Sequence, residues 1–302
     1  MSNAEYLNRS GPFETRYLAF LETITQLRPS LHRYCARMTG SVMDGEDVVQ
    51  EALFEAYRKL EKFDDNRTLK PWLFRIAHNR CIDFFRKRGV QIEAETAAAS
   101  PDEVKPTEPH GLGLGRALEH LVINLPPKER ACVLLKDVFD YSLEEIAELV
   151  DSTVGGVKAA LHRGRLKIKA SPVPTKFQKA ENPELVQLLG LYVDRFNSRD
   201  WNGVRELISA DAQLSVVARY AGPLVGSPYF GRYEQLPGPW KLAVGEIDGE
   251  PMVIVFEGDV GTWTRRWLVR LEVVNQRIER ITDYVFCPWI LEAATSTNLA
   301  AS

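Results

Sequence analysis

Basic side chains recur at helical spacing near the middle of the chain. The series is Lys158, His162, Arg165 and Lys169, with Arg163 and Lys167 farther round the same predicted helix. Residues three, four and seven apart lie on one face of an α-helix, so these cations would form a stripe. Such a stripe can pair with the phosphate groups of a nucleic acid, whose charge contributes strongly to affinity. The pattern favours DNA binding over an ordinary solvated face.

The residues before this stripe indicate how it would be presented. Ser142 and Glu145 have the spacing of a capping box, which predicts a short helix over 142–150. A turn over 151–153 then supplies the hydroxyl of Thr153 as a cap for a second helix that begins near Val154. A short helix, a tight turn and a basic helix form a helix-turn-helix, whose second helix enters the major groove of DNA.

Charge is distributed unevenly, although the whole chain carries a formal net charge of only −3. Eight carboxylates and three bases occupy residues 41–65, whereas six bases and one carboxylate occupy 70–88. Five bases and one carboxylate occupy 151–169. One acidic block beside two basic blocks suggests one surface for a basic protein and two surfaces for a polyanion.

Composition argues against several classes of protein. The chain has 302 residues, 45% of them hydrophobic, and no apolar run of the ~18–20 residues that a bilayer requires. Residues 1–9 lack the basic start and apolar stretch of a secretory signal, so we expect a cytoplasmic protein with no membrane segment. The four cysteines are scattered without CxxC spacing, which predicts buried reduced thiols and no metal site.

Candidates for catalysis are few in the C-terminal third of the chain. All five histidines precede residue 183, which leaves carboxylates and tyrosines as acids or bases. The candidates are Asp211, Asp283, Tyr220, Tyr229, Tyr233 and Tyr284. None has a spacing that requires catalysis, because Asp211 could cap a turn and Asp283 could pair with Arg280. We therefore predict that this region has no catalytic residues.

Two predicted linkers divide the chain into three domains. Residues 91–113 are acidic and rich in Ala and Pro, and residues 171–182 contain two closely spaced prolines. The domains are then 14–90, 114–170 and 183–292. The first two domains are predicted to be helical. In the first domain, Ser41 would cap one helix and Pro71 would begin another. The third opens with helices at 183–196 and 201–208.

The third domain then continues mainly as strands. Strand patterns cover 213–219, 240–247, 252–258, 263–274 and 277–286, with apolar and polar residues alternating in the fourth, and a long Gly/Pro-rich loop covers 219–231. Helices followed by an antiparallel sheet predict an α+β cone. The fold class is therefore multidomain, with two all-α domains followed by one α+β domain.

Two stretches resemble the sigma-70 family of transcription-initiation factors. Residues 44–60, Phe63 and the run PWLFRIAHNR at 71–80 resemble sigma region 2. The run LPPKER at 125–130 and the stretch 141–165 resemble sigma region 4. A short linker without a third sigma domain is typical of the extracytoplasmic-function (ECF) group. The third domain is similar to the SnoaL-like, NTF2-like extension of some ECF members.

The resemblance implies residues for three contacts. RNA polymerase core, through its β′ and β subunits, would bind Asp44, Glu46, Asp47, Gln50, Glu51, Phe54, Glu55 and Tyr57. The −10 promoter element would contact Asp64, Asp65, Asn66, Lys70, Trp72, Arg75, Asn79, Arg80, Arg86, Lys87 and Arg88, with a core anchor as the alternative role of Trp72. The −35 element would contact Ser152, Thr153, Gly155, Gly156, Lys158, Ala159, His162, Arg163 and Arg165.

The resemblance predicts a sigma factor, which directs polymerase to promoters and melts the −10 element without a cofactor. Gly155 and Gly156 depart from the residues usual in the family and lack polar groups, so −35 readout would depend on phosphates and DNA shape. The C-terminal domain would modulate activity, either by binding a small ligand or by docking onto other parts of the chain. The alternative is an isomerase or hydrolase of the cone fold, tethered to DNA by the helix-turn-helix.

Overall fold

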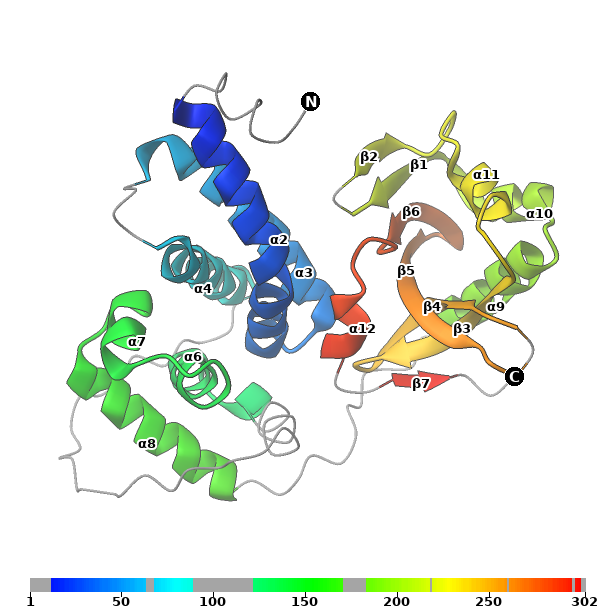
Figure 1. Ribbon diagram of the computed structural model, residues 1–302. Coiled ribbons are helices and arrows are strands. Elements are labelled where there is room, and N and C mark those ends of the chain that lie inside the picture. The colour runs from blue at the N-terminus through cyan, green and yellow to red at the C-terminus, as the bar shows by residue number, and fades with distance from the viewer. Residues whose placement is uncertain are drawn as a thin grey trace. The chain divides into compact units, whose positions relative to one another are not determined.

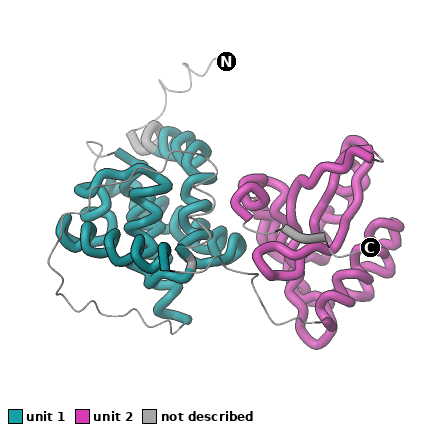
Figure 2. The backbone as a smooth tube through the Cα atoms, turned by 90° about the horizontal axis from the view of Figure 1, so that it is seen from below, with its two compact units in different colours: residues 1–175 teal, residues 176–302 magenta. Residues whose placement is uncertain are grey.

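The computed structural model describes residues 12–63, 68–88, 122–170, 183–217, 219–259, 261–294 and 297–299. The chain forms two compact units, residues 1–175 and 176–302, each with its own hydrophobic core (Figure 2). Both predicted linkers lie outside the described residues. The described part of the first unit is helical, whereas the second combines helices with a sheet, so the predicted fold class is confirmed.

The first unit begins with three long helices that pack on one another (Figure 1). They are α2 (Pro12–Thr39), α3 (Val42–Lys59) and α4 (Leu69–Lys87), with the short turn η1 (Leu60–Lys62) after α3. The predicted cap of α3 is formed, because the Asp44 backbone N–H donates to the Ser41 hydroxyl at 3.3 Å. The carboxylates of α3 alternate with a buried apolar stripe, which sets this helix against its neighbours.

One glycine sets the distance between α2 and α3. A Cβ atom placed on Gly45 would lie 2.5 Å from the backbone nitrogen of Ala36 and 2.6 Å from its Cα. The two backbones therefore touch at a point where no side chain fits.

The second half of the first unit contains the helix-turn-helix. It comprises η2 (Val122–Asn124), α6 (Pro127–Val133), the π-helical turn η3 (Leu134–Val138), α7 (Leu143–Leu149) and α8 (Val154–Ala170). Ser142 and Glu145 form both hydrogen bonds of the predicted capping box, at 3.1 and 2.8 Å. The Thr153 hydroxyl caps α8 by accepting from the Gly156 backbone at 3.0 Å. Both caps are as predicted.

The two helical halves of the first unit share one hydrophobic core. Phe139, between η3 and α7, contacts the rings of Tyr34 in α2 and Phe74 in α4, with centroids 5.9 and 5.6 Å apart. Tyr141 contacts the Phe74 ring at 5.5 Å. Arg130 in α6 donates to the carbonyl oxygen of Met38 at the end of α2. The helix-turn-helix therefore packs directly on the first three helices.

The second unit is a curled sheet with helices on it (Figure 1). Its strands are β1 (Ile208–Val216), β2 (Tyr220–Pro223), β3 (Trp240–Ile247), β4 (Glu250–Glu257), β5 (Thr264–Val274), β6 (Arg277–Asp283) and β7 (Thr297–Leu299), in the order β2-β1-β6-β5-β4-β3-β7. All neighbouring pairs are antiparallel except β1 and β6. Its helices are α9 (Pro183–Asn197), α10 (Trp201–Glu206), α11 (Tyr229–Glu234) and α12 (Trp289–Ala293).

Four of the five predicted strand patterns match β3, β4, β5 and β6 within three residues at each end, whereas β1 begins at Ile208, five residues before its predicted start. The predicted loop over 219–231 is wrong. Strand β2 and the start of α11 occupy most of that segment. Glycine and proline suggested a loop, yet Gly222 and Pro223 lie in an edge strand, where proline is tolerated. In α11, Tyr229 and Tyr233 lie one helical turn apart and both face the core. Tertiary packing therefore decides the structure of this segment.

Candidate protein and nucleic-acid interfaces

Four of the residues predicted to bind polymerase share one exposed face of α3. Asp47, Glu51, Phe54 and Tyr57 are all exposed, and their spacing places them on one side of the helix. Phe54 is 64% exposed and Tyr57 is 47% exposed, which is unusual for aromatic side chains of a soluble domain. Gln50 is partly buried beside them. An apolar pair flanked by carboxylates suits a partner with a basic rim and an apolar centre.

Two other predicted acids pair instead with α4. Asp44 accepts two hydrogen bonds from the Arg88 guanidinium, at 3.1 and 3.2 Å. Glu55 accepts from Arg80 at 2.5 Å and from Lys59 at 2.5 Å. Burial opposes ionisation of Glu55, but these hydrogen bonds outweigh it and lower the pKa of the carboxyl. Asp44 and Glu55 therefore hold α3 against α4, and in doing so they engage two arginines predicted to bind DNA.

Glu46 lies in the interior, contrary to its predicted exposure. Its side chain is fully buried and pairs with Arg28 of α2. The Val42 carbonyl and the His32 ring, 2.9 Å apart, lie in the same buried region, where desolvation lowers the pKa of His32. Glu46 therefore joins α2 to α3 and is not available to a partner in this structure.

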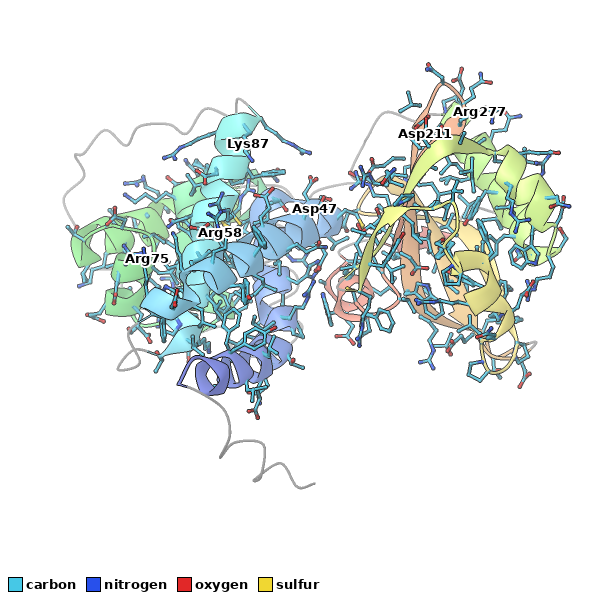
Figure 3. All side chains as sticks on the ribbon, turned by 90° about the horizontal axis from the view of Figure 1, so that it is seen from above. Asp47, Arg58, Arg75, Lys87, Asp211 and Arg277 are labelled. Atoms are coloured by element: carbon cyan, nitrogen blue, oxygen red, sulfur yellow. The ribbon has the colours of Figure 1, made fainter. Side chains whose placement is uncertain are left out.

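The residues predicted for the −10 element follow α4. Arg75 and Lys87 lie on this helix while Asp47 lies on α3 (Figure 3). Trp72 is half-buried against the core and contacts the Phe63 ring at 4.6 Å, so its surroundings match the core-anchor alternative. Lys70 lies over the Tyr141 ring at 5.4 Å. Asn79 is exposed, and Arg86 lies 3.3 Å from Asp83 of the same helix. Asp64, Asp65 and Asn66 lie outside the described residues.

The predicted recognition helix α8 exposes all four members of its basic stripe, Lys158, His162, Arg165 and Lys169. Lys158 and His162 are exposed one turn apart, and Thr153 and Gly155 are exposed at the start of the helix. Ser152, Gly156 and Ala159 are partly buried at that end. The backbone of α8 can therefore approach a surface closely at Gly155, where a Cβ atom would meet only the Thr153 hydroxyl at 3.9 Å.

Arg163 and Arg165 hold α8 in place within its own domain. Arg163 and Lys167 both pair with Glu129 of α6, each at 3.0 Å. Arg165 makes two hydrogen bonds to Asp137, at 3.1 and 2.5 Å, and these bonds raise the pKa of the guanidinium. The sequence predicts the positive charge of this helix, but it does not indicate that Glu129 and Asp137 pair with these cations.

A buried carboxyl lies inside the C-terminal unit. Asp283, 2% exposed, accepts hydrogen bonds from the Tyr233 hydroxyl at 2.7 Å and the Tyr229 hydroxyl at 2.9 Å. The Val285 backbone donates to its other oxygen at 2.9 Å. The pairing of Asp283 with Arg280 suggested by the sequence is wrong, since Arg280 lies 3.5 Å from Glu272. Asp211, an exposed residue of β1, does not cap a turn.

Burial raises the pKa of Asp283 to about 6, although the tyrosine hydroxyls, the Val285 N–H and the Arg232 charge oppose this shift. The folded state therefore binds more protons than the unfolded state between pH 4 and 6. Stability should fall as the pH rises through that range, because a raised carboxyl pKa favours folding only in the protonated state. The full shift corresponds to roughly 3 kcal/mol.

We expect the Asp283→Asn variant to lose this pH dependence, and Asp211→Asn to keep it. The measurement is urea unfolding between pH 4 and 7, followed by tryptophan fluorescence, since five of the six tryptophans lie in residues 176–302. An unchanged pH slope in Asp283→Asn would contradict the assignment.

The described ranges contain no group of three or more His, Cys, Asp or Glu side chains placed to hold a metal ion. All four cysteines are buried and none forms a disulfide, in agreement with the prediction of buried thiols. Among the described helices, none is long and apolar enough to cross a membrane.

Comparisons with known proteins agree with the sequence motifs. The family models for sigma-70 region 2 and sigma-70 region 4 match residues 23–90 and 115–168. The chain is 35% identical over 159 residues to the ECF RNA polymerase sigma factor SigW of Bacillus subtilis, covering 49% of this chain and 85% of that relative. It is 29% identical over 294 residues to the ECF sigma factor SigG of Mycobacterium tuberculosis, covering 85% of this chain and 78% of SigG.

Among solved structures, the ECF sigma factor SigJ of Mycobacterium tuberculosis matches 87% of this chain and 95% of its own length, with 17% identity and a TM-score of 0.35. The assignment to a family rests on the two sigma regions, on their order in the chain and on the identity with SigW. The chain belongs to the family of extracytoplasmic-function RNA polymerase sigma factors, and its function is to direct RNA polymerase to promoters.

Proposed function

We propose that the exposed face of α3 formed by Asp47, Glu51, Phe54 and Tyr57 binds the β′ subunit of core polymerase in the cytoplasm. The observation that carries this proposal is the division of the acids on α3. Asp44 pairs with Arg88 at the end of α4, Glu55 pairs with Arg80 of α4, and Glu46 is buried. The exposed carboxylates of α3, Asp47 and Glu51, therefore lie on the same face as Phe54 and Tyr57. The aromatic pair would supply contact area, and the carboxylates would steer a basic partner and fix its register.

For the promoter, we propose that α8 enters the major groove at the −35 element and that α4 contacts the −10 element. On α8, Lys158, His162 and Lys169 are the exposed basic groups that form no ion pair with another described residue. Of these, Lys158 and His162 lie nearer the N-terminal end of the helix, which would enter the groove. Gly155 lets the backbone approach the groove, so phosphate contacts and DNA shape would contribute more than base hydrogen bonds. On α4, Arg75, Asn79 and Lys87 would contact the DNA strands near the −10 element.

The C-terminal unit is proposed as a regulatory domain without catalytic activity. Asp283, its buried carboxyl of raised pKa, already accepts hydrogen bonds from three donors. A carboxyl held in this way is a poor general base, because proton transfer needs an accessible lone pair aimed at a substrate. The alternative, an enzyme of the cone fold tethered to DNA, would require turnover by this unit.

Transcription from a promoter library by purified core polymerase tests the promoter assignment. We expect specific start sites with the wild-type chain, and about tenfold less RNA with the Lys158→Ala/His162→Ala variant on promoters that depend on a −35 element. Added salt should inhibit that variant less steeply, because the phosphate contacts of Lys158 and His162 are missing. The Arg265→Ala variant, which removes an exposed cation of the second unit, should behave as wild type. Equal RNA yields from all three chains would contradict the role of α8.

The same assay tests the C-terminal unit with a chain that ends at residue 175, which retains the complete core of the first unit. A regulatory domain predicts that this deletion changes the RNA yield or the set of promoters used. An unchanged yield and promoter set would contradict the regulatory role.

A further inference from the structure

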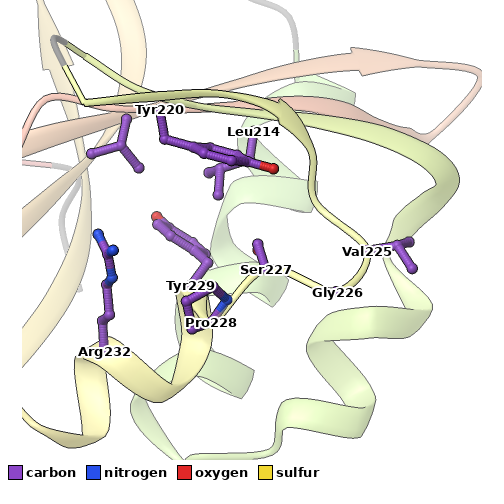
Figure 4. A pocket seen from close by; sticks show the side chains of 9 residues that line it. Leu214, Tyr220, Val225, Gly226, Ser227, Pro228, Tyr229 and Arg232 are labelled. Atoms are coloured by element: carbon purple, nitrogen blue, oxygen red, sulfur yellow. The ribbon is translucent and has the colours of Figure 1, made fainter.

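A cavity of about 240 Å³ opens between strand β1 and the segment that leads into α11 (Figure 4). Leu214 and Val216 of β1 form one wall, and Tyr220 forms another. The turn containing Val225 and Ser227 closes a third side, and Tyr229 and Arg232 complete the lining. All of these residues belong to the C-terminal unit, so the cavity is complete within it.

One charged group of this cavity, the guanidinium of Arg232, has no acidic partner among the described residues. Arg232 is an exposed residue that lines the cavity, and its guanidinium forms no ion pair or hydrogen bond with any residue that the structure describes. Asp283, whose carboxyl Arg232 influences electrostatically, is already held by Tyr229, Tyr233 and a backbone N–H. The guanidinium therefore remains able to bind an anion bidentately. The Ser227 hydroxyl, buried in the same lining, also has no hydrogen-bond partner.

The remaining walls are apolar, and at least one is held in place. The Tyr220 hydroxyl donates to the Pro223 carbonyl oxygen at 2.8 Å, which holds its ring along strand β2. Gly222 leaves the space for that ring, since a Cβ atom there would lie 2.9 Å from the Tyr220 hydroxyl. Val225 is 74% exposed and Tyr220 is 41% exposed, so apolar surface remains uncovered around the cavity.

We propose that this cavity binds a small organic monocarboxylate, with its carboxylate on Arg232 and its apolar body against Leu214 and Tyr220. The volume lies below the ~300–1,000 Å³ of sites for drug-sized ligands, which limits the body to one ring or a short chain. A single guanidinium matches one carboxylate, and the apolar walls disfavour a bare inorganic anion, which would lose its hydration without apolar contacts in return. This inference goes beyond the proposed function, because the sigma domains can act as proposed whether or not this site exists.

The experiment is a ¹⁹F NMR titration of the full chain with 4-fluorobenzoate. The uncharged 4-fluorobenzamide and the cationic 4-fluorobenzylamine have nearly the same shape and serve as matched probes. We expect saturable binding of the benzoate in the millimolar range, and binding at least about tenfold weaker for the amide and the amine, because only the carboxylate pairs with a guanidinium. Equal binding of the three probes, or no saturable binding of the benzoate, would overturn the proposal.

Variants locate the site. Arg232→Gln should weaken benzoate binding at least about tenfold and bring it close to that of the amide. Val225→Asp should also weaken it by placing a negative charge beside the ligand, and this exposed position should tolerate the change without loss of folding. Arg265→Gln removes another exposed arginine and should have no effect. If Arg232→Gln and Arg265→Gln bound benzoate as wild type does, the ligand would lie elsewhere and the proposal would be wrong.

Discussion

Reversal of the two exposed carboxylates of α3 should abolish most binding to core polymerase. We expect the Asp47→Lys/Glu51→Lys variant to bind core about 100-fold or more weakly, and to lose transcription in proportion. Like charges facing a basic partner cost several kcal/mol at an interface, and 1.4 kcal/mol corresponds to a tenfold change in affinity. Both side chains are exposed, so the variant should fold normally. The measurement is a titration of labelled core polymerase, with circular dichroism as the check on folding.

A variant with the same change in net charge separates the effect of position from that of total charge. Glu184→Lys/Asp194→Lys reverses two exposed carboxylates on α9 of the second unit. We expect its affinity for core polymerase to stay within about twofold of wild type, since screening weakens distant exposed charges. If both double variants bound core as tightly as wild type, the α3 face would not be the polymerase contact.

The Gly45→Ala variant should lower the free energy of unfolding of the first unit by about 3 kcal/mol or more. The added Cβ atom would lie within 2.6 Å of two backbone atoms of Ala36, so α2 and α3 would have to move apart. That movement would disturb the buried Arg28–Glu46 pair, which joins the same two helices. The measurement is denaturant unfolding followed by far-ultraviolet circular dichroism, in which the helices of the first unit contribute most of the signal.

The same substitution at an open position is the control. At Gly155 the nearest atom to an added Cβ is the Thr153 hydroxyl oxygen at 3.9 Å, so Gly155→Ala adds helix propensity without a clash. We expect it to stabilise the first unit by about 0.5–1 kcal/mol. A Gly45→Ala protein as stable as wild type would mean that the α2–α3 contact is looser than the structure shows.

The helices and the sheet could be predicted because their signals are local. The Ser142–Glu145 capping box and the Thr153 cap each depend on residues within one element, and both are present. Strand β5 also forms where alternation predicts a strand, although Leu268, on the side expected to be polar, is buried as well. Helix α11 was missed because glycines and prolines surround its two buried tyrosines, whose partner Asp283 is distant in sequence. A local pattern cannot show that a carboxyl fifty residues away will hold these hydroxyls.

Individual site residues were harder to assign than the helices that carry them. Asp44 and Glu46 are indistinguishable by charge in the sequence of α3, yet the structure pairs Asp44 with Arg88 and buries Glu46. On α8, Arg165 is bound to Asp137, whereas Lys158 is exposed without an ion pair among the described residues. The sign of a surface depends on which charges are neutralised by neighbouring elements, and this follows only from the packed fold.

The contact between the two helical halves of the first unit buries both apolar rings and a charged guanidinium, and burial has opposite effects on the free energies of these groups. The rings of Phe139 and Tyr141 gain from leaving solvent, which favours contact. Arg130, at the same joint, is 8% exposed, and loss of hydration lowers its pKa to about 10 even with the Met38 carbonyl as acceptor. Separation of the two halves would expose the rings to water, which is unfavourable, and would restore the hydration of the Arg130 guanidinium, which is favourable. The joint is therefore easier to open than its aromatic contacts alone would suggest.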